Sequence, residues 1–149
     1  MDEASFENPS DDELREIYDE TSTIAVVGAS ANPGKPAFAI PRQLKDLGYR
    51  IVPVNPKGGE IHGERAYGSL DEVDVPIDVV DVFRPAEETP DIARQAVKAG
   101  AKVLWLQEGI VSDEAAAVAR EGGLTVVMGI CMGHTARRLG ISPRRPDRD

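Results

Sequence analysis

The loop after the first apolar run carries residue types suited to binding a phosphate group. Gly28, Ala29 and Ser30 are small, so a ligand can approach the backbone closely, and the Ser30 hydroxyl can bond a phosphate oxygen. Lys35 follows as a positive charge near the expected start of a helix, whose amino end offers free N–H groups and the positive end of its dipole. The pattern favours an anion site over a tight turn that needs glycine for its geometry alone.

The same loop departs from the G-x-G-x-x-G fingerprint of dinucleotide-binding domains. Only Gly28 is kept, while Ser30 and Pro33 occupy the positions of the other glycines. The end of the second apolar run, Pro53 to Lys57, lacks the acid that binds a ribose 2′-hydroxyl in NAD sites. Lys57 suits a phosphorylated ribose, although a solvated loop lysine explains it equally well. These residues disfavour NAD and leave NADP or a 3′-phosphorylated adenosine open.

Aromatic and basic side chains follow the third apolar run. Phe83 suits stacking on adenine, and Arg84 suits pairing with a phosphate. The alternative is that Phe83 belongs to the core and that Arg84 pairs with Glu87 or Glu88. The residues alone do not decide between these two interpretations.

The remaining loops offer few groups capable of catalysis. After the fourth run, Gln107 is a neutral hydrogen-bonding group and Gly109 permits close approach, whereas Glu108 is a single carboxylate without an identified partner. Cys131 lies three residues before His134 and has three possible interpretations. It is a nucleophile with His134 as its base, a thiol that meets a ligand's sulfur, or a small buried hydrophobic residue. The last is the commonest case, so we assign no catalytic residue. One cysteine and two histidines show no zinc spacing, and we expect no metal.

Composition excludes several classes of protein. The 149 residues suit one domain, and a net charge of −9 argues against a general nucleic-acid or anionic-membrane binder. The acidic amino terminus is not a secretory signal, and no apolar run approaches the roughly 20 residues that cross a bilayer. With its single cysteine, the chain is expected to be cytoplasmic.

Apolar runs of strand length alternate with helical patterns along the chain. We expect a docking helix after Ser10, with Glu13 completing a capping box. Continuous apolar strands between helices are typical of a parallel sheet covered on both faces. The sequence therefore predicts an α/β fold with a doubly wound, mainly parallel, five-stranded sheet. The expected strands are 23–27, 50–54, 79–83, 102–106 and 124–127, and the other expected helices are 38–47, 89–98, 112–121 and about 135–139.

Three regions complete the expected organisation. Residues 1–21 form an acidic lead-in with its helix, of which 1–9 are expected to be loose; the segment is a partner-binding element or, more simply, a solvated lead-in. Residues 22–141 form the ligand-binding domain, which contains a long loop at 57–70. Residues 142–149 are charged, contain proline, and are expected to form a flexible tail.

Four motifs in order resemble the small stand-alone CoA-binding proteins, which share their fold with the CoA-binding domain of the succinyl-CoA synthetase α subunit. The resemblance runs from about residue 23 to residue 131. The motifs are Val27-Gly-Ala-Ser-Ala-Asn-Pro33, Gly48-Tyr-Arg-Ile-Val-Pro-Val-Asn-Pro-Lys57, Asp78-Val-Val-Asp-Val-Phe-Arg84 and Ala101-Lys-Val-Leu-Trp-Leu-Gln-Glu-Gly109.

This resemblance implies a Rossmann-like sheet that holds CoA across the ends of its strands. The family's cysteine segment usually resembles D-R-C-P-x-x-E, whereas this chain has Gly129-Ile-Cys-Met-Gly-His134, which puts a role for that segment in placing the pantetheine arm in question. The implied site residues are Gly28, Ala29, Ser30, Pro33, Lys35, Pro53, Asn55, Lys57, Phe83, Arg84, Gln107 and Gly109.

The expected function is therefore recognition of coenzyme A or an acyl-CoA without catalysis, by a carrier or a regulatory module. Larger CoA ligases use a catalytic histidine in a second domain for which this chain is too short. The alternatives are an NADP-dependent oxidoreductase and a subunit of an acyl-CoA transferase or ligase. A protein partner or a homo-oligomer is a further expectation.

Overall fold

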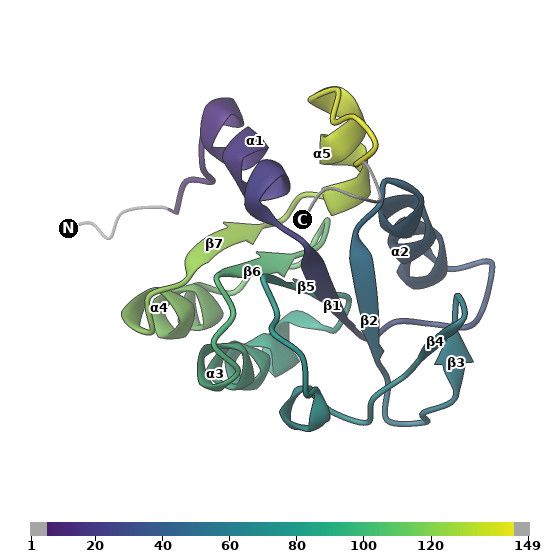
Figure 1. Cartoon of the computed structure of the whole chain (residues 1–149). Helices are drawn as coiled ribbons and strands as arrows, with labels where there is room; N and C mark the ends of the chain where they lie inside the picture. The colour runs from purple at the N-terminus through teal and green to yellow at the C-terminus, as the bar shows by residue number, and fades with distance from the viewer. Residues whose placement is uncertain (1–5, 145–149) are drawn as a thin grey trace.

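A computed structural model describes residues 6–144, and a parallel sheet of five strands lies at its centre (Figure 1). The strand order is β2-β1-β5-β6-β7, with every neighbouring pair parallel. This confirms the predicted α/β architecture, with bounds that differ from the prediction by one residue at some strand ends. The strands are β1 (Thr23–Val27), β2 (Arg50–Val54), β5 (Val79–Val82), β6 (Val103–Leu106) and β7 (Thr125–Met128).

Helices cover both faces of this sheet, because successive strand residues point to opposite sides. In β1, Ile24 and Val26 pack under one helical layer, while Ala25 packs under the other. The first layer contains α1 (Asp11–Glu20), α2 (Pro36–Asp46) and α5 (Met132–Arg138), and the second contains α3 (Thr89–Lys98) and α4 (Asp113–Glu121). Because both faces are covered, the strands are mainly apolar; the charged residue buried among them is Asp81 in β5.

The strand order places a topological switch point between β1 and β5. From β1 the chain crosses to β2 on one side and later returns to pair β5 along the other side. The loops that follow β1 and β5 therefore diverge at the carboxyl edge of the sheet. A ligand crevice is expected at this place in doubly wound folds.

Helix α2 begins at Pro36, two residues earlier than predicted. Proline suits the first turn because no N–H is needed there. Pro41 lacks the N–H that would bond the carbonyl of Ala37, and that carbonyl instead accepts from the backbone N–H of Ser30 at 3.1 Å. The loop after β1 thus satisfies the hydrogen bond that the internal proline leaves open.

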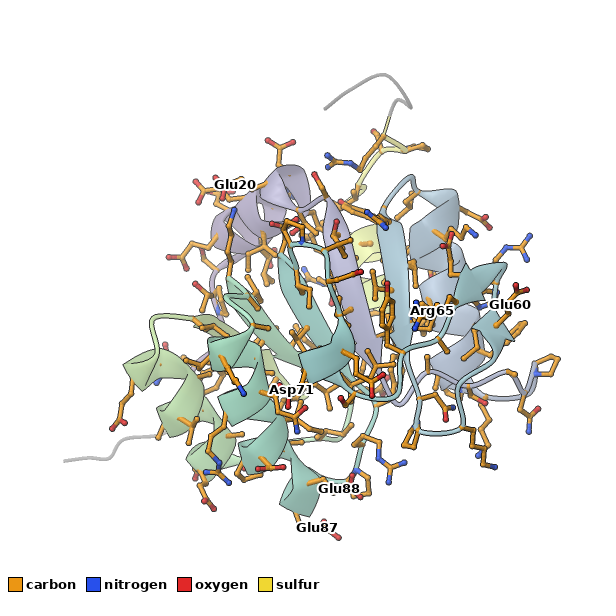
Figure 2. The ribbon with its side chains drawn as sticks, turned by 60° about the horizontal axis from the view of Figure 1, so that its bottom comes forward. Glu20, Glu60, Arg65, Asp71, Glu87 and Glu88 are labelled. Carbon is orange, nitrogen blue, oxygen red and sulfur yellow. The ribbon has the colours of Figure 1, made fainter. Side chains whose placement is uncertain are left out.

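The region predicted as a plain loop at 57–70 contains a short antiparallel hairpin, β3 (Glu60–Ile61) and β4 (Glu64–Arg65). Figure 2 labels Glu60 and Arg65 on its two strands. His62 at its turn has a positive φ of 56°, and its Nε2 lies 2.7 Å from the carbonyl oxygen of Phe38 in α2. This contact fixes the hairpin against the helix. Two 3₁₀ turns, Leu70–Glu72 and Ala86–Glu88, lie in the connections around β5.

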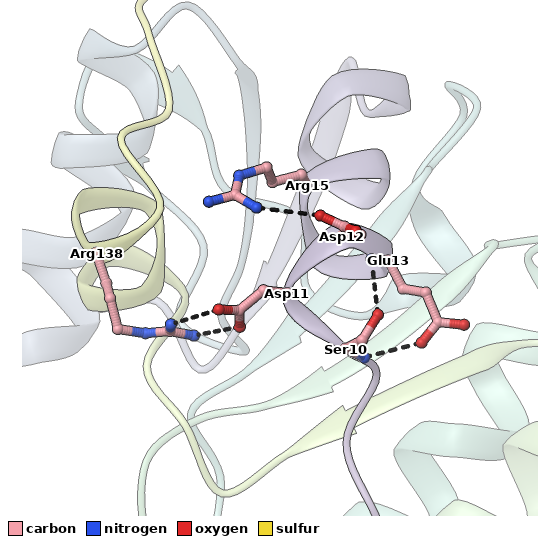
Figure 3. Close-up of polar contacts among 6 residues, drawn as sticks. All are labelled: Ser10, Asp11, Asp12, Glu13, Arg15 and Arg138. Carbon is pink, nitrogen blue, oxygen red and sulfur yellow. Dashed lines mark hydrogen bonds and ion pairs between the residues drawn. The ribbon is translucent and has the colours of Figure 1, made fainter.

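The predicted capping box of α1 is confirmed (Figure 3). The Ser10 hydroxyl accepts from the N–H of Glu13 at 3.2 Å, and the Glu13 carboxylate accepts from the N–H of Ser10 at 2.8 Å. On the neighbouring helix α5, the guanidinium of Arg138 donates two 3.1 Å hydrogen bonds to the carboxylate of Asp11. The first helix is thereby attached to the last.

Residues 6–9 are anchored, which corrects the prediction that residues 1–9 are loose. The side-chain amide of Asn8 donates to the carbonyl of Met128 at 3.0 Å and accepts from its N–H at 2.9 Å, so it continues the hydrogen bonding of edge strand β7. In the predicted tail, the N–H of Arg144 donates to the carbonyl of Leu47 at 2.7 Å. Residues 1–5 and 145–149 lie outside the described residues.

Helix α5 begins at Met132 rather than near Thr135. The Cys131 sulfur accepts a hydrogen bond from the N–H of His134 at 3.4 Å and so serves as the cap of the helix. The sequence did not show this start because cysteine is not among the usual capping residues.

Candidate functional site

A cavity of about 710 Å³ lies at the carboxyl ends of β1, β2 and β5, at the switch point. Its size falls in the usual range for small-molecule sites. We call it the first cavity. Eight of the predicted site residues line it, and they come from three loops that are distant in sequence: Gly28, Ala29, Ser30, Lys35, Asn55, Lys57, Phe83 and Arg84.

Gly28 lies where the loop after β1 meets the backbone that follows β5. Its φ is +89°, a left-handed conformation that favours glycine. A Cβ at this position would lie 3.0 Å from the carbonyl oxygen of Phe83 and 2.9 Å from the Arg84 Cδ. The glycine is therefore required both by its backbone conformation and by the backbone beside it.

The loop after β1 is held in shape by its own polar groups. The Ser30 Oγ accepts from the N–H of Asn32 at 3.0 Å, which leaves the hydroxyl hydrogen available to a ligand. Asn55 donates to the carbonyl of Ala29 at 2.8 Å and accepts from the N–H of Lys57 at 2.8 Å. Asn55 therefore joins the loops after β1 and β2, a contribution to the site that needs no direct contact with a ligand.

Three cationic side chains line the first cavity; two of them are unpaired within residues 6–144 and the third forms an ion pair. Lys35 and Lys57 are exposed, and neither forms an ion pair within residues 6–144. Arg84 donates to both carboxylate oxygens of Glu88, at 2.9 and 2.8 Å, and this bond lowers the pKa of Glu88. Glu88 lies at the end of the molecule where α3 begins (Figure 2). The structure thus contains the Arg84–Glu88 ion pair, which was one of the two interpretations of Arg84 that the sequence left open.

A second cavity, of about 800 Å³, adjoins the first at Phe83, which lines both. It lies over the ends of β6 and β7 and is walled mainly by apolar side chains, including Ile40, Ile110 and Ile130. The three candidates for reactivity, Glu108, Cys131 and His134, also line it. The hydrogen bond between Cys131 and His134 involves the backbone N–H and not the imidazole, so it does not form a nucleophile–base pair.

Gln107 lines the second cavity but is almost wholly buried, with 4% of its surface exposed. Its Nε2 donates to Asp81 in the central strand, and its Oε1 accepts from the N–H of Met132 at 3.4 Å. Sequence reasoning missed Asp81. A single charged residue inside an apolar strand was the signal, because such a residue needs a partner when both faces are covered.

Three predicted site residues line neither cavity. Pro33 and Gly109 are exposed at the surface, and Pro53 is buried within β2. The first cavity has apolar walls that the sequence did not single out, including Leu70 from the 3₁₀ turn and Ile92 from α3. Leu70 is a core residue that ends the loop after the hairpin, so only the tertiary arrangement brings it to the site.

The opposite edge of the sheet is chemically unsuited to a phosphate. A cavity of about 450 Å³ there lies between the N-terminal segment, α1 and the amino ends of β5 to β7. Its walls include two basic residues and five acidic ones, Glu7, Glu13, Glu16, Glu20 and Asp78. In residues 6–144, no group of three or more His, Cys, Asp or Glu side chains is placed to hold a metal ion. No helix in this same part of the chain has the length and apolar character to cross a membrane.

Comparison with known families identifies the domain. Residues 22–137 match the family model described as CoA binding domain. The uncharacterized protein YneT of Bacillus subtilis is 41% identical over 127 residues, which cover 85% of this chain and 94% of that protein. Among solved structures, a hypothetical protein from Pyrococcus horikoshii OT3 superposes with a TM-score of 0.86 and 36% identity, covering 91% of this chain and 98% of the other.

Larger relatives contain this domain as one part. The ADP-forming acetate–CoA ligase of Methanocaldococcus jannaschii is 36% identical over 80 residues, which cover 54% of this chain but 11% of the ligase. A dinucleotide-forming acetyl-coenzyme A synthetase 1 of Ca. Korarchaeum cryptofilum superposes with a TM-score of 0.67 and 27% identity over 78% of this chain and 27% of that one. This chain therefore matches a small fraction of each enzyme.

Proposed function

The chain belongs to the CoA-binding domain family, and from that premise we propose that it binds coenzyme A or an acyl-CoA without catalysing a reaction on it. The observation that carries the proposal is the first cavity. It lies at the switch point, and eight residues expected to contact CoA line it. The proposed ligand-binding domain is residues 22–141.

In the proposed complex, the phosphates of CoA lie at the first cavity. Lys57 pairs with the 3′-phosphate, while Lys35 and the Ser30 hydroxyl face the pyrophosphate at the start of α2. The adenine packs between apolar walls such as Leu70 and Ile92. The pantetheine arm passes Phe83 into the second cavity, which places the thiol or acyl group beside apolar side chains.

Absence of catalysis is proposed from the chemistry of the second cavity. Glu108, Cys131 and His134 are the reactive side chains there, and among residues 6–144 no hydrogen bond joins the side chains of any two of them. An acid–base or nucleophilic mechanism needs convergent groups within hydrogen-bond reach of each other or of the substrate. A carrier or a regulatory module fits this arrangement.

A second candidate is a subunit that contributes its CoA site to a larger ligase or transferase. It is favoured by the relatives in which this domain is one part of an ADP-forming acetate–CoA ligase. An NADP-dependent oxidoreductase is the third. The cytoplasmic location and the protein partner or homo-oligomer stay predictions.

The direct test is native mass spectrometry of freshly purified protein followed by calorimetric titration. We expect an adduct of CoA mass that survives desalting, and micromolar or tighter binding, which corresponds to at least about 8 kcal/mol. NADPH, which carries a 2′-phosphate instead, is the comparison ligand. Tighter binding of NADPH than of CoA would favour the oxidoreductase, and thioester turnover by the isolated chain would refute the non-catalytic role.

Lys57→Glu is expected to weaken CoA binding by about 10- to 100-fold, because it replaces a charge-assisted bond with repulsion. Dephospho-CoA, which lacks the 3′-phosphate, should lose less than about threefold. Titration of both ligands measures the difference. Lys98→Glu, which makes the same charge change on an exposed side chain at the far end of α3, is the matched control. Equal losses for the two ligands would contradict the proposed contact.

Glu88→Gln is expected to strengthen CoA binding by up to about fivefold. The change weakens the ion pair that holds Arg84 and leaves the guanidinium free to approach a phosphate. Glu87→Gln is the control, since its charge is as close in sequence but its side chain does not bond Arg84. Weaker binding by Glu88→Gln than by the control would show that Glu88 positions Arg84 for the ligand.

A further inference from the structure

Asp81 is a fully buried carboxyl group in the central strand of the sheet. Its register neighbours in β1 and β6 are Val26 and Trp105, and it has no exposed surface. One carboxyl oxygen, Oδ1, accepts from Gln107, while Oδ2 has no hydrogen-bond partner within residues 6–144. An ionised carboxylate without partners for both oxygens is costly in such a place. Burial accordingly raises the pKa of Asp81 to about 7, against the hydrogen bond from Gln107, which lowers it.

The ionisable groups of the same layer are already engaged elsewhere. From α1, the Tyr18 hydroxyl donates to the carbonyl of Met132 at 2.6 Å. From the residue before β2, the Tyr49 hydroxyl donates to the carbonyl of Tyr18 at 2.7 Å. On the α5 side, Cys131 caps its helix and Arg138 pairs with Asp11. From α2, the polar side chain directed at this layer is the neutral Gln43. None of these bonds reaches the Asp81 carboxyl.

Gln107 connects this carboxyl to the wall of the second cavity. One end of its amide donates to Asp81, and the other accepts from the N–H of Met132. The segment 129–133, which contains Met132, supplies Gly129, Ile130 and Cys131 to the cavity wall. Three more side chains hold the same segment: Trp105 to the carbonyl of Ile130 (2.9 Å), Tyr18 to that of Met132 (2.6 Å) and Gln43 to that of Gly133 (2.9 Å).

We propose that Asp81 and Gln107 form a buried positioning pair, which couples a proton on Asp81 to the conformation of residues 129–133 and so to the affinity for ligand at the second cavity. The proposal rests on the proposed function, in which the pantetheine arm reaches that cavity.

The direction of the coupling follows from the geometry. The arrangement described is the protonated one, since Oδ2 has neither a donor nor a water-accessible surface. After ionisation Oδ2 needs water or an N–H group. The backbone on both sides of Asp81 is paired within the sheet, and the polar side chain that contacts its carboxyl is Gln107, so a rearrangement that supplies a donor involves Gln107 and the segment bonded to it. Ionisation therefore loosens the cavity wall, and a ligand packed on that wall favours the protonated form.

The test compares CoA affinity in wild type and Asp81→Asn between pH 6.5 and pH 8.5. Asparagine keeps the shape and the acceptor for Gln107 but cannot ionise. We expect wild-type affinity to fall by about three- to tenfold more than that of the variant over this range, because one linked proton changes affinity by at most about tenfold per pH unit. Titrating groups of CoA and of its lysine partners contribute equally to both proteins, so the difference isolates Asp81.

A second measurement keeps the test decisive if the variant folds poorly. Calorimetry of the wild type in two buffers of different ionisation enthalpy counts the protons taken up on binding. We expect uptake of a fraction of a proton near pH 7.5 with CoA, beyond that of the ligand's own phosphate. Matching pH profiles, or absence of this extra uptake, would overturn the coupling. Failure of the wild type to bind CoA at any pH would instead overturn the proposed function.

Discussion

Gly28→Val is expected to lower the affinity for CoA by at least about 100-fold, equivalent to about 2.7 kcal/mol. Valine at a φ of +89° is strained, and its Cβ would lie 3.0 Å from the carbonyl oxygen of Phe83. Relief of that contact requires the loops after β1 and β5 to separate, which displaces Arg84 and Phe83 from the first cavity. Isothermal titration with CoA, together with circular dichroism to establish folding, measures the effect.

The matched control for this substitution is Gly123→Val. Gly123 has almost the same φ, +90°, but no heavy atom within 4 Å of its added Cβ, and it lies at the opposite edge of the sheet before β7. It should lose stability from backbone strain while keeping its affinity for CoA. Gly28→Ala, which adds a single methyl group, gives the same comparison if the valine variant does not fold. Unchanged binding by a folded Gly28 variant would remove this loop from the site.

Asp81→Asn is expected to gain stability relative to wild type as the pH rises, by about 2 kcal/mol between pH 5 and pH 7. An aspartate in the unfolded chain ionises near its ordinary pKa of 3.8, whereas burial raises the pKa of folded Asp81 to about 7. Between these values the unfolded state has lost a proton that the native state keeps, so wild-type stability falls as the pH rises. The slope is about 1.4 kcal/mol per pH unit and ends above pH 7.

Urea denaturation of both proteins at several pH values measures this difference. Any constant cost of burying the asparagine amide cancels, because only the change of the difference with pH is compared. Asp71→Asn removes the same formal charge from an exposed position and is the control (Figure 2). A difference between wild type and Asp81→Asn that stays constant from pH 5 to pH 7 would show that Asp81 does not titrate in this range.

The fold was predictable from the sequence because its signals are local. Each strand is an apolar run bounded by turn residues, and Ser10 and Ser112 mark helix starts with their capping bonds. Errors arose where a distant partner decides the local structure. Asn8 is ordered by Met128, and the 60–65 hairpin is held by Phe38 and Lys45, contacts that no nearby pattern announces.

The candidate site was predictable to the extent that strand ends converge in a parallel sheet. The loops after β1, β2 and β5 meet at the first cavity as their order requires. The sequence could not show which hydrogen-bond or ion-pair partner each polar side chain of the site has in the folded protein. Arg84 is paired with Glu88, and Asn55 joins two loops, states that depend on geometry finer than strand order. The Asp81–Gln107 bond likewise links residues 26 positions apart.

The proline inside α2 has a consequence for how the loop after β1 meets a ligand. By leaving the Ala37 carbonyl open, Pro41 provides the acceptor that the Ser30 N–H uses. With an ordinary residue at this position, the helix itself would compete for that carbonyl. The imperfection of the helix thus preorganises the loop, so less conformational entropy is lost on association. Pro41 weakens helix α2 in isolation, but it holds the neighbouring loop in its binding conformation before a ligand is bound.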